Sequence, residues 1–190
     1  MSQNRHLYSS WILFIGVVVA LTLFNPVTVI VASYFGAWLF ALLTRQRGLC
    51  VRLVIGIVIA IIWMLIAKGQ YGYADHSVAV YGITIFPLFA IPSALVGLYL
   101  IYETVTLWVR PVTMRSDWLL IIVLDVLLVT AMEFIGYHIF QIQNLATSQY
   151  PGFAWCDCFH APWWMQLSYY GFPIIFFAVY QVLEKRYLRK

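Results

Sequence analysis

Two carboxylic acids stand inside one of the most apolar stretches of the chain. Asp125 and Glu133 occur in DWLLIIVLDVLLVTAMEFIGYHIF, residues 117–140. If this stretch crosses a membrane as a helix, the acids lie about 8 and 16 residues from its cytoplasmic end, at hydrocarbon depth. An ionised carboxylate there costs about 2.5–3.5 kcal/mol, so each acid must face a cavity, find a partner or stay protonated.

A protonated acid in a dry site can donate its proton to a lipophilic substrate or pass it along a relay. We therefore expect Glu133 and Asp125 to be catalytic. Thr130 and Tyr137 share a helix face with Glu133 at i, i+3 and i+7 spacing, so both are predicted to bind the substrate. Asp125 is rotated by about 80° from Glu133 on the same helix. The alternative is that the acids only hold neighbouring helices together by hydrogen bonds.

A second stretch, QYPGFAWCDCFHAPWWM at residues 149–165, combines soft ligands with aromatic rings. Cys156, Cys158 and His160 alternate, so an extended segment would present them on one face as candidate zinc or copper ligands. The usual structural zinc pattern has cysteine pairs spaced C-x2-4-C, which this chain lacks. We therefore predict no metal, with Cys156, Cys158 and His160 as the weak candidate ligands, and the sequence leaves the cofactor unknown.

A disulfide between the two cysteines would close a small ring, either as a redox pair or as a loop staple. The favoured interpretation is an aromatic lid with membrane anchors and a staple. Trp155 and Trp163 are then predicted to contact the substrate.

The composition shows which solvent surrounds these residues. The chain has 190 residues, of which 64% are hydrophobic and 9% are charged, against roughly 25% charged in soluble domains. Such a chain cannot cover a surface that faces water, so its partner is the lipid bilayer. The formal charge of +4 is scattered at segment ends, and without a basic stripe it does not indicate nucleic-acid binding.

Long apolar runs predict transmembrane helices of about 20 residues each. Residues 7–44 carry no charge and as one helix would be over ~50 Å long, so we split them at Asn25–Pro26. A re-entrant or kinked element is the alternative, which leaves five spans. The six predicted spans are about 8–24, 27–44, 51–68, 80–104, 116–140 and 165–184.

The basic residues predict the orientation of these spans. With six spans, all but Lys68 of the 11 Lys and Arg residues fall on one side. The positive-inside rule then places both termini in the cytoplasm and the large aromatic loop 141–164 outside.

The sequence thus predicts an all-α integral membrane protein, with residues 1–190 forming one transmembrane domain, a six-helix bundle. We expect it in a bacterial inner membrane, as an enzyme acting on a lipid or isoprenoid-like substrate through a buried carboxylic acid. The alternatives are a transporter of small solutes or protons, and an assembly subunit that binds other membrane subunits.

Overall fold

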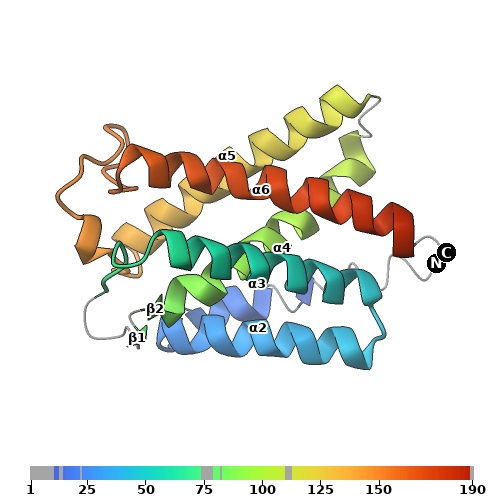
Figure 1. Ribbon diagram of the computed structural model, residues 1–190, viewed down its shortest axis with the longest axis horizontal. Helices are drawn as coiled ribbons and strands as arrows, with labels where there is room; N and C mark the ends of the chain where they lie inside the picture. Colours follow the sequence, from blue (N-terminus) through green and yellow to red (C-terminus); the bar gives the residue numbers. More distant parts are fainter. Residues whose placement is uncertain are drawn as a thin grey trace.

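The chain folds into long helices that run up and down and are joined by short connections (Figure 1). The structure is a computed structural model that describes residues 11–12, 15–21, 23–73, 79–81, 83–109 and 113–188. Its long helices are α2 (Pro26–Leu43), α3 (Arg47–Ile66), α4 (Ile85–Val109), α5 (Met114–His138) and α6 (Trp163–Leu183). The smaller elements are β1 (Ala79–Val80), β2 (Ile83–Thr84), the 3₁₀ turn η1 (Leu145–Thr147) and the π-helical turn η2 (Glu184–Leu188).

Local chemistry explains where several helices begin. The Asn25 side chain accepts hydrogen bonds from the backbone N–H groups of Val27 and Thr28, and Pro26 occupies the first turn, where no N–H is needed. Residues 15–21 are also helical, so the chain does break at Asn25–Pro26 as predicted. Thr113 and Ser116 cap the start of α5 with a reciprocal capping box. The beginning of the predicted span 8–24 lies outside the described residues.

The predicted start of the span at residue 80 is wrong. Ala79–Val80 and Ile83–Thr84 pair as an antiparallel hairpin, and α4 begins only at Ile85. The hairpin turns at Tyr81, whose φ is +53°. A short apolar run rich in β-branched residues fits a strand as well as a helix, which is why the periodicity misplaced this boundary. The helix continues to Val109 instead of ending at residue 104.

Within the described chain, four helices are long and apolar enough to cross a membrane: α2, α3, α4 and α5. Many of their large apolar side chains face outward, including Leu39 on α2 and Leu65 on α3. An outward face of this kind fits a lipid solvent, because lipid tails are as apolar as these side chains. The structure is therefore that of an all-helical membrane protein with a small hairpin.

The main core lies where α3, α4 and α6 meet. Trp63, Leu98 and Phe176 are buried there together with Ile121 of α5. Helices α3 and α4 approach closely at Gly56, where a Cβ atom would lie 2.8 Å from the Cβ of Pro92. This contact holds α4 along the inner side of the bundle, where it can line a cavity.

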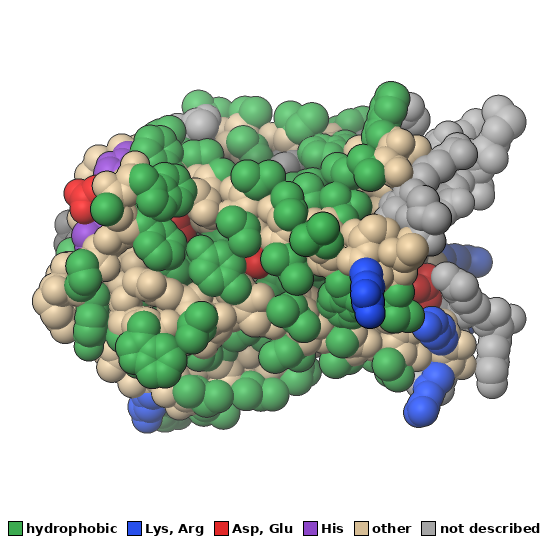
Figure 2. All heavy atoms as spheres, turned by 90° about the horizontal axis from the view of Figure 1, so that it is seen from above, with side chains coloured by type: hydrophobic (Ala, Val, Ile, Leu, Met, Phe, Trp, Pro, Cys, Tyr) green, Lys and Arg blue, Asp and Glu red, His purple; other side chains and the backbone are tan. Residues whose placement is uncertain are grey.

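The charges of the described residues separate between the two ends of the bundle. Lys and Arg side chains gather toward one end, and His side chains lie at the other (Figure 2). One arginine differs from these side chains because it is largely buried. Arg52 belongs to α3, with its side chain only 12% exposed and its Nη1 3.5 Å from a carboxylate oxygen of Glu103.

Candidate functional site

A cavity of about 530 Å³ lies between the helices, mostly within the apolar part of the bundle. Its walls come from α2, α3, α4, α5 and α6, with Val18 of the N-terminal helical segment and Phe159 of the loop before α6. The volume falls in the roughly 300–1,000 Å³ range of ligand pockets. Met132 and Ile135 line the cavity and are also 44% and 38% exposed, so it reaches the outer surface between the helices.

The structure brings both predicted acids to this cavity. Asp125 is only 4% exposed, Glu133 is half-buried, and both line the same wall of α5. Val129, Met132 and Gly136 lie between and beside them, as expected for one stripe of a helix. Within the described chain, neither carboxyl group makes a hydrogen bond or an ion pair. Acidic side chains are visible among hydrophobic ones midway along the molecule (Figure 2).

Of the two residues predicted beside Glu133, only one lines the cavity. Tyr137 does so, one turn beyond Glu133. Thr130 lies at the edge of the stripe and interacts with Tyr170 of α6. Its hydroxyl therefore ties α5 to α6, the role that the structural alternative assigned to polar groups in this helix.

A hydrogen-bonded chain of aromatic side chains faces Glu133 from the other helices. The Trp63 indole N–H donates to the Tyr71 hydroxyl at 2.6 Å, and the Tyr71 and Tyr169 oxygens are 2.9 Å apart. Burial raises the pKa of Tyr71 to about 12, although its hydrogen bonds to Trp63 and Tyr169 act in the opposite direction. Tyr71 is therefore neutral at physiological pH. Tyr169 lines the cavity and connects this row of hydrogen-bonded side chains to it.

The sequence did not predict that these hydrogen-bonded tyrosines belong to the site. Tyr71 and Tyr73 follow α3, whereas Tyr169 is almost 100 residues away on α6. The available signal was the pairing of tyrosines at predicted span ends, which is equally typical of an interfacial aromatic belt. The exposed fraction distinguishes a site residue from a belt residue. Tyr71 is only 8% exposed, whereas a belt residue would face the headgroups.

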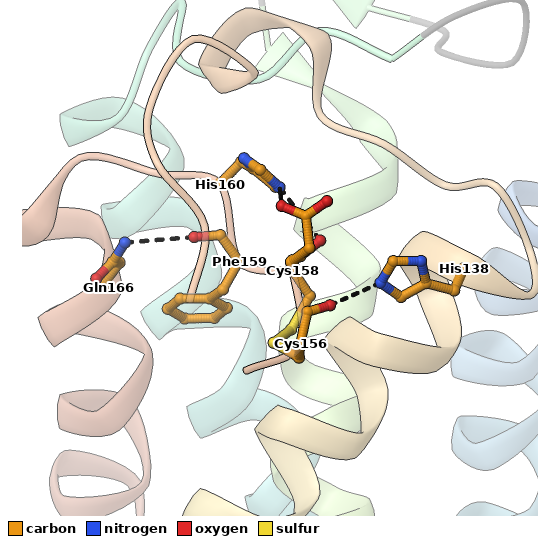
Figure 3. Close-up of a disulfide and its surroundings, with 7 residues drawn as sticks. His138, Cys156, Cys158, Phe159, His160 and Gln166 are labelled. Atoms are coloured by element: carbon orange, nitrogen blue, oxygen red, sulfur yellow. Dashed lines mark hydrogen bonds and ion pairs between the residues drawn. A yellow bond between two sulfur atoms is a disulfide. The ribbon is translucent and has the colours of Figure 1, made fainter. Parts of the chain in front are cut away.

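A tight turn closed by a disulfide covers the end of the cavity near Glu133. Cys156 and Cys158 are bonded to each other, with the Cα atoms 5.1 Å apart (Figure 3). Phe153 donates its backbone N–H to the Cys158 carbonyl, and the His138 ring nitrogen Nε2 lies 2.8 Å from the Cys156 carbonyl. Since a carbonyl only accepts, His138 donates here. His138 thus holds the turn and does not pair with Glu133.

His160 is fixed between this turn and the cavity (Figure 3). Its Nδ1 is 2.9 Å from the Tyr150 carbonyl, and its Nε2 is 3.2 Å from the Asp157 carbonyl and 3.4 Å from the Asp157 carboxylate. The ring stacks on Tyr137 with centroids 4.9 Å apart. His160 lines the cavity within electrostatic range of Glu133, so the turn carries a polar group to the acid.

The two tryptophans predicted to contact the substrate lie elsewhere. Trp155 is 68% exposed and stacks on Phe153, and Trp163 is 72% exposed at the start of α6. Neither lines the cavity. Both face outward, as interfacial anchors do, because an indole ring combines apolar area with one polar N–H. The inner aromatic cover is Phe159, which is buried and packs against Tyr169.

The residues considered as metal ligands are engaged in other bonds. The sulfur atoms of Cys156 and Cys158 are joined, and both ring nitrogens of His160 face oxygen atoms. No group of three His, Cys, Asp or Glu side chains comes together among the residues described.

The far end of the cavity holds a second polar group. Arg52 lies over the Tyr99 ring at 4.0 Å and over the Tyr180 ring at 5.4 Å, while pairing with Glu103. Both Arg52 and Glu103 line the cavity. The cavity therefore has two polar ends, joined by an apolar middle that contains Asp125.

Comparison of the chain with protein-family models, with curated proteins and with solved structures gives no match.

Proposed function

We propose that this protein is a membrane enzyme that binds a lipid or isoprenoid-like substrate in the cavity and uses Glu133 as a general acid. The observation that carries the proposal is the presence of two carboxyl groups in one cavity whose other walls are mainly hydrocarbon. A carboxylic acid without charged partners in such a site is favoured as the protonated, proton-donating form.

The surrounding groups suit this role. Tyr137 and Tyr169 can hydrogen-bond a polar atom of the substrate beside Glu133, and His160 lines the cavity with them. Phe159 and the disulfide-closed turn limit access of water from that end. Asp125, about two turns deeper on α5, would supply a second proton-binding site.

The orientation that we propose for the chain is the one that its charges favour. Arg45 lies in the turn before α3, Arg47 and Arg115 lie in the first turns of α3 and α5, and Lys185 and Arg186 follow α6. The starts of α3 and α5 and the end of α6 lie at the same end of the bundle (Figure 1). We propose six spans, with both termini in the cytoplasm of a bacterial cell and the disulfide outside, where oxidation is permitted. This adds α6 and the N-terminal helical segment to the four helices above.

The test is the lipid profile of cells that express the protein. Replacing Glu133 with Gln keeps the side-chain shape but removes the transferable proton, so the product lipid should disappear and its precursor should accumulate. Mass spectrometry of total lipid extracts measures both. Glu184→Gln, an acid outside the cavity lining, is the matched control and should leave the profile as in wild type. Identical profiles for wild type and Glu133→Gln would reject the general-acid role.

Proton-coupled transport is the second candidate, and one observation favours it. Glu103, Asp125 and Glu133 line the same cavity at successive depths, an arrangement that could pass a proton along the bundle. Purified protein in liposomes with an internal pH-sensitive dye distinguishes the two functions. A proton flux that Asp125→Asn and Glu133→Gln both abolish would support transport. If the wild-type protein shows no proton flux, the enzyme remains the proposed function.

A further inference from the structure

We infer that the ligand of this cavity is a lipid with one hydrocarbon chain and no charged headgroup, lying along α4 with its polar end beside Glu133. The inference rests on the proposed function only in that the reacting end of the lipid is placed beside Glu133. It is carried by the dimensions of the cavity and by the charges that line it.

The cavity is long. Its lining residues on α4 extend from Phe86 to Glu103, a rise of about 26 Å at 1.5 Å per residue. Its volume of about 530 Å³ gives room for one extended hydrocarbon chain along this length.

The volume also sets the length of the chain. A methylene group is close in size to a water molecule, whose share of liquid volume is about 30 Å³. The cavity therefore holds roughly 18 such groups. A single isoprenoid or acyl chain of this size would fill the cavity from the Arg52 end to the Glu133 end.

The charges that line the cavity exclude an anionic headgroup. Among the described residues Arg52 is the only Lys or Arg in the lining, and Glu103 already balances its charge. Asp125 and Glu133 would repel a phosphate if ionised, and a buried anion without cations is costly. His160 does not supply the missing cation, because its Nε2 lies 3.4 Å from the Asp157 carboxylate, which would balance a positive charge on the ring.

The polar end of the ligand belongs at the covered end of the cavity. Glu133 and Tyr137 line the cavity there, and both side chains can hydrogen-bond a hydroxyl or carbonyl group. Along the middle, Ala90, Ala94 and Leu128 offer only hydrocarbon. A neutral, single-chain alcohol or ketone matches both regions.

Native mass spectrometry of the detergent-extracted protein tests this inference with three probes: geranylgeraniol, geranylgeranyl diphosphate and phosphatidylglycerol. We expect one geranylgeraniol per chain, bound at least roughly tenfold more tightly than either charged probe. Ala94→Trp fills the middle of the cavity and should weaken binding of geranylgeraniol at least about tenfold. Gly36→Trp, on α2 where nothing lies within 4 Å of the glycine, is the matched control and should bind as wild type does.

A photoreactive diazirine analogue of geranylgeraniol provides a second measurement on the unaltered chain. Cross-links should map to cavity residues such as Ala94 and Met132, and not to Leu39 or Val58 on the outer faces of α2 and α3. Equal binding of a charged probe, or cross-links spread over the outer faces, would overturn the inference. Loss of turnover by Glu133→Gln is measured separately from these binding and cross-linking results, so the ligand class and the catalytic role can fail independently.

Discussion

Arg52 illustrates how single residues in this chain combine burial with charge. Its guanidinium group lies over the rings of Tyr99 and Tyr180 and beside the carboxylate of Glu103. The planar, weakly hydrated guanidinium can stack on rings and pair with a carboxylate at once, which an ammonium group cannot do. Glu103 is 42% exposed, so solvent screens the ion pair and the ring contacts contribute most of the stabilisation.

Arg52→Lys should therefore destabilise the protein although the charge is kept. Loss of the two ring contacts should cost about 1–2 kcal/mol of unfolding free energy. Thermal unfolding of the purified protein in detergent measures this as a lower Tm. Arg47→Lys, an exposed position at the start of the same helix, should leave the Tm unchanged. An equal Tm for both variants would show that stacking on Tyr99 contributes nothing.

At the scale of elements, the position of α4 decides the shape of the cavity. The helix is held against α3 at Gly56, where the Cα of Pro92 would lie 3.0 Å from an added Cβ. Pro92 lies inside α4 and has no N–H to complete the helical hydrogen bonds. The absence of a side chain on α3 is thus what allows the two helices to approach this closely.

Gly56→Ala should push α4 away from α3. Overpacking of this kind typically costs about 1–3 kcal/mol, which should appear as a lower Tm in detergent. Gly36→Ala is the control on α2, where the new methyl group meets open space. It should be neutral or slightly stabilising, because Ala is the better helix former. If Gly56→Ala were as stable as the control variant, the contact between α3 and α4 would be looser than described.

The elements also show what the sequence could and could not predict. Pro26, the charged turns and the long apolar runs placed five helices within a few residues of their observed bounds, apart from the hairpin before α4. The eight-residue spacing of Asp125 and Glu133 was enough to bring both to one stripe of α5.

The remaining parts of the site depend on contacts between distant segments. Tyr71 and Tyr169 meet only when α3 and α6 pack together, and His160 reaches the cavity because a tight turn holds it there. Helical periodicity carries no information about either contact. The state of Cys156 and Cys158 was also open, because two cysteines two residues apart can be bridged, free or ligating.

At the scale of the whole molecule, the number of membrane crossings decides on which side of the membrane each loop lies. Four helices satisfy length and composition for a membrane span, and the charges favour two more. With α4, α5 and α6 all crossing, Lys68 and Lys185 lie on opposite sides of the membrane. This arrangement places the disulfide and Lys68 on the same side, opposite to Arg45 and Arg47.

Cysteine labelling in intact cells tests this topology. In a Cys50→Ser background, a membrane-impermeant maleimide should label Lys68→Cys from outside and should label Lys185→Cys only after the cells are opened. Cys50 is the free cysteine of the described chain, so it has to be removed first. Labelling of both positions from the same side would mean an even number of crossings between them and would remove α6 or another helix from the bundle.

The opening of the cavity beside Met132 and Ile135 determines the route by which a ligand enters. Such a molecule can slide in sideways from the surrounding leaflet without ever dissolving in water. Occupancy would then follow its mole fraction among the neighbouring lipids, so dilution of the membrane with inert lipid should slow the reaction while dilution of the buffer should not.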